Sequence, residues 1–131
     1  MRRILIIDDE PYVLEALKRV LASTAVVVVA STADAGLSAM GEAPVDLVIV
    51  DVILPGMDGV EAIKLIRRDY PGVRIIAISG GGNFGLNSYL PDAISTSAYL
   101  AACKAAGADG VLAKPFETAE LRSLINQVEA A

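Results

Sequence analysis

The chain has 131 residues, with 11 lysines and arginines against 16 aspartates and glutamates, and a formal net charge of -5. A domain of this length folds without metal or disulfide staples, and the single cysteine, Cys103, permits no internal disulfide. The acidic balance disfavours a nucleic-acid or anionic-membrane surface. No apolar run approaches the roughly 18 residues of a membrane span, and acids end the first apolar run too early for a signal peptide, so we expect a cytoplasmic protein.

Strands and helices are predicted to alternate along the chain. Short apolar runs rich in β-branched residues predict strands over Arg3–Ile7, Ala25–Ala30, Asp46–Val50, Val73–Ile78 and Gly110–Ala113. Helical periodicity and capping residues predict helices around Val13–Leu21, from Thr32 as N-cap to Met40, over Gly59–Arg68, from about Asp92 to Ala106, and around Leu121–Val128. This order predicts an α/β fold, a flavodoxin-like, doubly wound, five-stranded parallel sheet with helices on both faces. Ligands of such sheets bind at the carboxyl ends of the strands.

Polar side chains follow four of the predicted strands. They are Asp8, Asp9 and Glu10 after the first strand, Asp51 after the third, Ser79 after the fourth, and Lys114 with Pro115 after the fifth. Carboxylates gathered at one edge repel one another unless a cation joins them, and Mg2+ suits oxygen ligands. Singly, each residue has a plainer interpretation: helix N-caps for Asp8 to Glu10, a loop residue for Ser79 and a solvated charge for Lys114. Their coincidence at four strand ends favours one site.

The segments IIDDEP, DLVIVDVILPGMDGVEAIKLIR, IIAISG and GADGVLAKPF resemble the receiver domains of two-component response regulators, and the resemblance runs from about Arg2 to Val128. It implies that Asp51 accepts a phosphoryl group from a sensor histidine kinase or a phosphotransfer protein, and that the phosphorylated form dephosphorylates itself slowly. It also implies that Ser79 is the switch hydroxyl and that Lys114 pairs with the phosphoryl group. An aligned nucleophile and nearby cations are what phosphoryl transfer needs.

The same resemblance implies a magnesium site. In it, Asp9 and Asp51 would bind the ion directly, Asp8 would act through water, and the backbone carbonyl of Ile53 would complete the protein ligands. The peptide bond that precedes Pro115 would be cis, a conformation that proline makes accessible.

Two features depart from the family's pattern. The aromatic switch residue three positions before the lysine is Val111 here, so the usual coupling of hydroxyl and aromatic motion is not assured. The second is an extended loop over about residues 80–91, before the fourth helix. It contains G-x-G-x-x-G through Gly80, Gly82 and Gly85, a dinucleotide fingerprint that here follows the wrong strand and opens no helix. A flexible turn, a lid and a partner surface are the other interpretations of this loop.

The sequence thus predicts a phospho-accepting signalling switch rather than a classical enzyme, with residues 1–131 as a single receiver domain. Its expected partners are a kinase or phosphotransfer protein and a downstream protein target or fused output domain, with no direct nucleic-acid contact and no membrane insertion. It would be a stand-alone relay or a receiver cut from a longer chain. Two rivals stay open: a receiver-like interaction module that takes up no phosphate, and a small nucleotide- or flavin-binding protein. The absence of histidine excludes a phosphohistidine carrier and a histidine-ligated metal enzyme.

Overall fold

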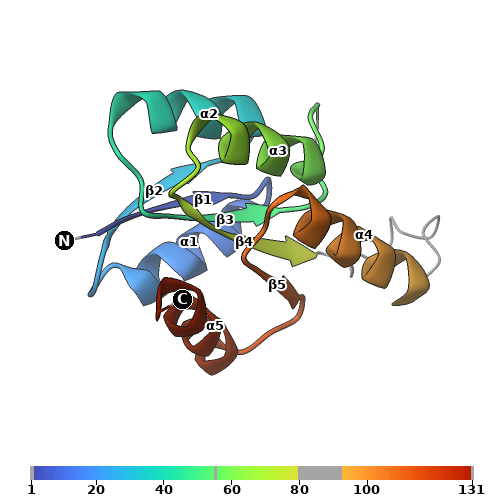
Figure 1. The fold of residues 1–131 in the computed structure, drawn as a ribbon. Helices are drawn as coiled ribbons and strands as arrows, with labels where there is room; N and C mark the ends of the chain where they lie inside the picture. Colours follow the sequence, from blue (N-terminus) through green and yellow to red (C-terminus); the bar gives the residue numbers. More distant parts are fainter. Residues whose placement is uncertain (1, 55, 80–92, 131) are drawn as a thin grey trace.

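The computed structural model describes residues 2–54, 56–79 and 93–130, which form five strands and five helices in alternation (Figure 1). The strands are β1 (Arg3–Ile7), β2 (Val26–Ala30), β3 (Leu47–Asp51), β4 (Arg74–Ser79) and β5 (Gly110–Ala113). The helices are α1 (Pro11–Leu21), α2 (Ala33–Glu42), α3 (Gly59–Asp69), α4 (Ala93–Ala106) and α5 (Thr118–Ala130). Every predicted strand is present, β1 and β5 with the predicted bounds, and β3 and β4 displaced by one residue toward the C-terminus.

The strands form one parallel sheet with the order β2-β1-β3-β4-β5. This order confirms the flavodoxin-like winding, in which the strand order reverses between β1 and β3 and a crevice opens at their carboxyl ends. The site is therefore expected beside the ends of β1 and β3.

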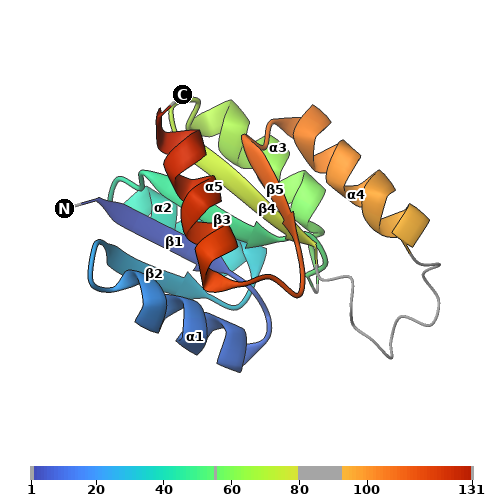
Figure 2. The same cartoon turned by 90° about the horizontal axis from the view of Figure 1, so that it is seen from below.

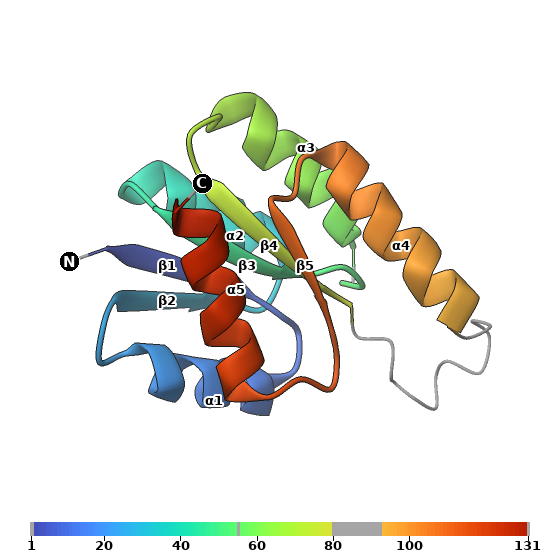
Figure 3. The ribbon, with the colours of Figure 1, turned by 60° about the horizontal axis from the view of Figure 1, so that its bottom comes forward.

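Helices cover both faces of the sheet, so the central strands β1, β3 and β4 are apolar between their end residues. Alternate residues of β1 serve the two sides: Leu5 and Ile7 belong to the core beneath α2, α3 and α4, and Ile4 and Ile6 to the core beneath α1 and α5. Figure 2 shows α1 and α5 in front of the sheet, and Figure 3 shows α4 running beside α3 at the β5 edge.

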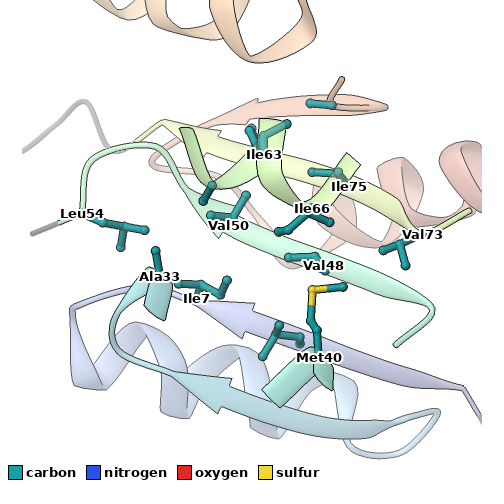
Figure 4. Packing of buried hydrophobic residues seen from close by; sticks show 14 of the residues in the cluster. Ile7, Ala33, Met40, Val48, Val50, Leu54, Ile63, Ile66, Val73 and Ile75 are labelled. Carbon is teal, nitrogen blue, oxygen red and sulfur yellow. The ribbon is translucent and has the colours of Figure 1, made fainter. Parts of the chain in front are cut away.

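The first of these cores is drawn in Figure 4. Ile63 and Ile66 of α3 lie over Val48 and Val50 of β3, and all four side chains are fully buried. Fully burying an aliphatic side chain of this size contributes about 1.5–3 kcal/mol relative to leaving it exposed. The tightly packed strand β3 is thus a rigid support for the residue at its carboxyl end.

Two helices begin at side-chain caps, the predicted N-cap Thr32 for α2 and Asp58 for α3. Thr32 Oγ1 accepts a hydrogen bond from the backbone N–H of Ala35 at 3.0 Å, and Asp58 Oδ1 accepts one from Glu61 at 2.8 Å. Such caps satisfy backbone donors that the first helical turn leaves without partners.

Gly36 in α2 is explained by packing. A Cβ atom at this position would lie 2.8 Å from Cγ1 of Ile7, closer than van der Waals contact allows. The sequence leaves open whether Gly36 permits close packing or fraying, and the structure shows close packing of α2 on β1.

Arg67 of α3 joins the segments that precede β4 and β5, at the amino ends of these strands. Its guanidinium donates to the carbonyl of Gly107 at 2.8 Å, to that of Val73 at 2.8 Å, and to the carboxylate of Asp109 at 2.8 Å. Gly107 has φ +127, a conformation that side chains other than glycine rarely adopt. This network fixes where α4 ends and β5 begins.

The predicted loop over about residues 80–91, with Gly80, Gly82 and Gly85, lies outside the described residues, so its interpretations stay predictions. Among the helices that are described, none has both the length and the apolar character needed to cross a membrane.

Candidate functional site

The register of the strands brings the predicted site residues to one edge. Ile7 pairs with Val50, so Asp8 and Asp51, the residues that follow them, end neighbouring strands. Asp51 pairs with Ile78, so Ser79 lies one residue further along β4. Ser79 in turn pairs with Ala113, and its carbonyl accepts a hydrogen bond from the backbone N–H of Lys114 at 2.9 Å.

Lys114 is the centre of the polar contacts at this edge. Its Nζ donates to Asp8 Oδ2 at 3.0 Å and to Glu10 Oε1 at 3.2 Å. A longer contact of 3.5 Å joins Nζ to Asp51 Oδ2. The Asp8 and Asp51 side chains are 2% and 5% exposed, so this ammonium compensates two carboxylates that are removed from water.

Burial governs the electrostatics of the two carboxylates. Desolvation, with a further contribution from the charge of Asp8, raises the pKa of Asp51 to about 6, although Lys114 and the N–H of Ile53 oppose the shift. Desolvation likewise raises the pKa of Asp8. For Lys114, desolvation alone lowers the pKa, but the facing charges of Asp51 and Asp8 outweigh it and the pKa is raised. The site therefore holds a permanent cation and two carboxylates that resist ionisation together.

Asp8, Asp9 and Asp51 form a cluster that could hold a metal ion. One carboxylate oxygen from each residue lies within 4.8 Å of the others, and Asp9 is exposed to solvent. Three acid groups this close favour a bound cation, and their oxygens are the ligands that Mg2+ prefers. Ile53 is adjacent: its backbone N–H donates to Asp51 Oδ1 at 3.1 Å.

Glu10 is among the predicted strand-end acids, but the sequence assigns it no role in the site. It occupies the N-cap position of α1 without making a side-chain capping bond, so capping is the wrong interpretation for this side chain. Its carboxylate instead contacts Lys114, and its other oxygen, Oε2, accepts a hydrogen bond from the hydroxyl of Tyr12 at 3.2 Å. Asp8 Oδ1 accepts from the backbone N–H of Glu10 at 2.9 Å and so fixes the turn between them. The adjacency of Glu10 to Asp8 and Asp9 is the only signal in the sequence.

The remaining predicted positions are placed as follows. Ser79 is buried at the end of β4, and the bond between Lys114 and Pro115 is cis, as the resemblance implies. Val111 lies on β5, is half-buried, and packs against the core on the α3 and α4 side of the sheet. An aliphatic side chain thus occupies the place where the family's aromatic switch residue is expected.

A family model, curated proteins and solved structures that match this chain all point to the same family. Residues 4–126 match the family described as the response regulator receiver domain. The chemotaxis protein CheY of Bacillus subtilis is 34% identical over 128 residues, which cover 95% of each chain. A CheY-like receiver domain from Methanospirillum hungatei has the same fold, with a TM-score of 0.79, 28% identity, and 97% and 92% of the two chains covered. The transcriptional regulatory protein YvrH of Bacillus subtilis is 34% identical, but the match covers 93% of this chain and only 46% of YvrH. Among curated relatives such as YvrH, the chain matches only about half of the relative's length, or less.

Proposed function

The chain belongs to the response regulator receiver domain family, and on this premise we propose that it acts as one domain, over residues 1–131, that accepts a phosphoryl group on Asp51. The family is one of signalling phosphoacceptors rather than classical enzymes. One observation carries the proposal: Asp51 is a nearly buried carboxylate at the end of a rigid central strand, with an ammonium 3.5 Å from Oδ2 and two further aspartates beside it. A mere structural carboxylate gains nothing from this crowding.

The donor is a phosphohistidine of a sensor kinase or phosphotransfer protein. A carboxylate oxygen of Asp51 forms a bond to phosphorus while the bond between phosphorus and the histidine nitrogen breaks. The nitrogen leaves with the electron pair and takes a proton from water. Because phosphoryl transfer depends on alignment and on stabilisation of charge at the equatorial oxygens, the fixed position of Asp51 and the cation of Lys114 supply what the chain contributes.

Mg2+ fits the acidic cluster, and we assign Asp9 and Asp51 as direct ligands, Asp8 as a ligand through water, and the carbonyl of Ile53 as a further ligand. The carboxylate oxygens of Asp8, Asp9 and Asp51, which lie within 4.8 Å of one another, support this assignment, since crowded carboxylates bind a divalent cation that relieves their repulsion. When bound, the ion neutralises charge on the phosphoryl oxygens.

Phosphorylation would act as a switch through the neighbouring strand ends. The new phosphoryl group brings strong acceptor oxygens and a negative charge, to which Ser79 can donate its hydroxyl proton and with which Lys114 can pair. Val111 lacks the aromatic ring of the family's pattern. The conformational change that follows phosphorylation would therefore depend on Ser79 and on the backbone of β5. Slow attack of water on phosphorus would break the bond to the Asp51 oxygen, release inorganic phosphate and return Asp51 to its free carboxylate.

The partners follow from this role. Upstream we place the kinase or phosphotransfer protein, and downstream a protein target or a fused output domain. YvrH is by its name a transcriptional regulatory protein, and the match covers 46% of it, so in relatives of that kind an output function would reside beyond the matched part. The net charge of -5 disfavours direct contact of the receiver itself with nucleic acid, and we place the protein in the cytoplasm without insertion into a membrane.

The test is the intact mass of the protein after incubation with acetyl phosphate, with and without Mg2+. We expect one phosphoryl adduct that requires Mg2+ and is absent from Asp51→Asn. Folded wild-type protein that gains no adduct with Mg2+ present would contradict the proposal and favour an interaction module independent of phosphorylation.

A further inference from the structure

The ammonium of Lys114 is shared among carboxylates from two segments of the chain. An ammonium has three N–H donors, and within the described residues Asp8, Glu10 and Asp51 accept from it at 3.0, 3.2 and 3.5 Å. The carboxylate of the proposed phosphoacceptor is thus the most distant of the three. Lys114 is held closer to the β1–α1 turn than to Asp51.

Of the three partners, Glu10 is the one that Lys114 can exchange at least cost. Its side chain is 33% exposed, whereas those of Asp8 and Asp51 are 2% and 5% exposed. A half-exposed carboxylate that loses its ion-pair partner is solvated by water, whereas a buried one is left uncompensated.

Glu10 is nevertheless held in place for this contact. Its backbone N–H donates to Asp8 Oδ1 at 2.9 Å, and the hydroxyl of Tyr12 donates to Oε2 at 3.2 Å, which leaves Oε1 directed to Lys114. Tyr12 is 71% exposed and contributes no comparable burial to the core. With Tyr12 bound to Oε2, the other carboxylate oxygen of Glu10 is placed at the rim of the site as an acceptor for Lys114.

We propose that Glu10 is a positioning residue that holds Lys114 in the unphosphorylated protein and releases it when a phosphoryl group arrives on Asp51. This inference rests on the function proposed above. The phosphoryl oxygens and the Glu10 carboxylate compete for the position of the same ammonium, which Glu10 and Asp8 hold at 3.2 and 3.0 Å while Asp51 lies 3.5 Å away. The free energy of the Glu10 contact is therefore lost when Lys114 moves to the phosphoryl group. Glu10 thereby sets how readily the switch turns on.

The test measures the affinity of the full chain for beryllofluoride, a phosphoryl analogue, by isothermal titration calorimetry at saturating Mg2+. Glu10→Gln keeps the shape of the side chain and removes its charge. We expect beryllofluoride to bind this variant roughly two- to fivefold more tightly, within the range that loss of a partly exposed ion pair spans. The phosphoryl adduct formed from acetyl phosphate should accumulate to a higher fraction in the same variant.

Two matched variants separate positioning from general electrostatics. Glu15→Gln makes the same change of charge on α1, where Glu15 is exposed and lies 4.0 Å from Arg19, and should leave the affinity as in the wild type. Glu10→Asp keeps the charge but shortens the reach to Lys114, and should resemble Glu10→Gln. Equal tightening in Glu10→Gln and Glu15→Gln, wild-type affinity in Glu10→Asp, or no tightening in Glu10→Gln would each overturn the inference. A wild-type protein that binds no beryllofluoride and gains no adduct would instead defeat the proposed function, and the inference with it.

Discussion

Replacing Asp51 by asparagine should stabilise the metal-free protein at neutral pH. Asparagine has the shape of the protonated carboxyl group but no charge to keep away from water. Burial raises the pKa of Asp51 from 3.8 to about 6, a shift of about two units, and each unit corresponds to 1.36 kcal/mol. The upper bound is therefore about 3 kcal/mol. Because Lys114 also holds Asp8 and Glu10, the wild-type site can relax, and we expect a gain of about 1–3 kcal/mol.

The pH dependence of this gain has a definite sign. A carboxyl group whose pKa is higher in the folded state binds its proton more tightly there, so it favours folding at low pH. The folded state loses that advantage as the pH rises from about 4 to about 6. The difference in unfolding free energy between Asp51→Asn and wild type should therefore be small near pH 4 and complete above about pH 6.

Urea unfolding at several pH values, with and without Mg2+, measures this difference. Mg2+ should narrow or reverse it, because the ion stabilises the wild-type cluster and the variant lacks one of the proposed ligands. The reasoning is refuted if the variant is less stable than the wild type in metal-free buffer at pH 7, or if the difference does not change between pH 4 and pH 7.

Three further predictions concern residues outside the site. Gly36→Ala should destabilise the protein by about 1–3 kcal/mol in urea unfolding, despite the better helix propensity of alanine, because its Cβ would overlap Ile7. Adding Ile7→Val should recover part of this loss, and additive effects of the two substitutions would contradict the packing argument. Arg67→Met should cost about 2–4 kcal/mol, since partly buried carbonyls such as those of Val73 and Gly107 lose their donor, and an unchanged urea midpoint would contradict this. Cys103 is fully buried, which raises its thiol pKa to about 11, so iodoacetamide at pH 8 should label it only on unfolding; rapid labelling of folded protein would contradict that burial.

Most of the fold can be predicted from the sequence because the apolar pattern and the helix caps agree with each other. Thr32 and Asp58 are followed at once by helices, and the aliphatic runs that become β1 and β3 are buried on both sides, as their unbroken apolar character indicates. The one-residue displacement of β3 and β4 has a simple cause: polar Asp51 and Ser79 still pair with the neighbouring strands. Apolar periodicity does not detect such residues.

The site is predicted as a set of strand ends, but its internal contacts are not. That Asp8, Asp51 and Lys114 share one edge follows from the parallel order of strands, since carboxyl ends meet there. That Glu10 turns to Lys114 instead of capping α1 depends on the distance between two loops, which no local pattern encodes. The network of Arg67 joins residues about 40 positions apart and escapes sequence reasoning for the same reason.

The central claim is that Asp51 carries the phosphoryl group, and the most direct test is to locate the adduct. Borohydride reduces an acyl phosphate on aspartate to homoserine, so protein treated with acetyl phosphate and Mg2+ can be reduced, digested and sequenced by mass spectrometry. We predict homoserine at position 51 and at no other aspartate, and none when Mg2+ is omitted. Homoserine at Asp8 or Asp9, or at no position in folded protein, would contradict the account.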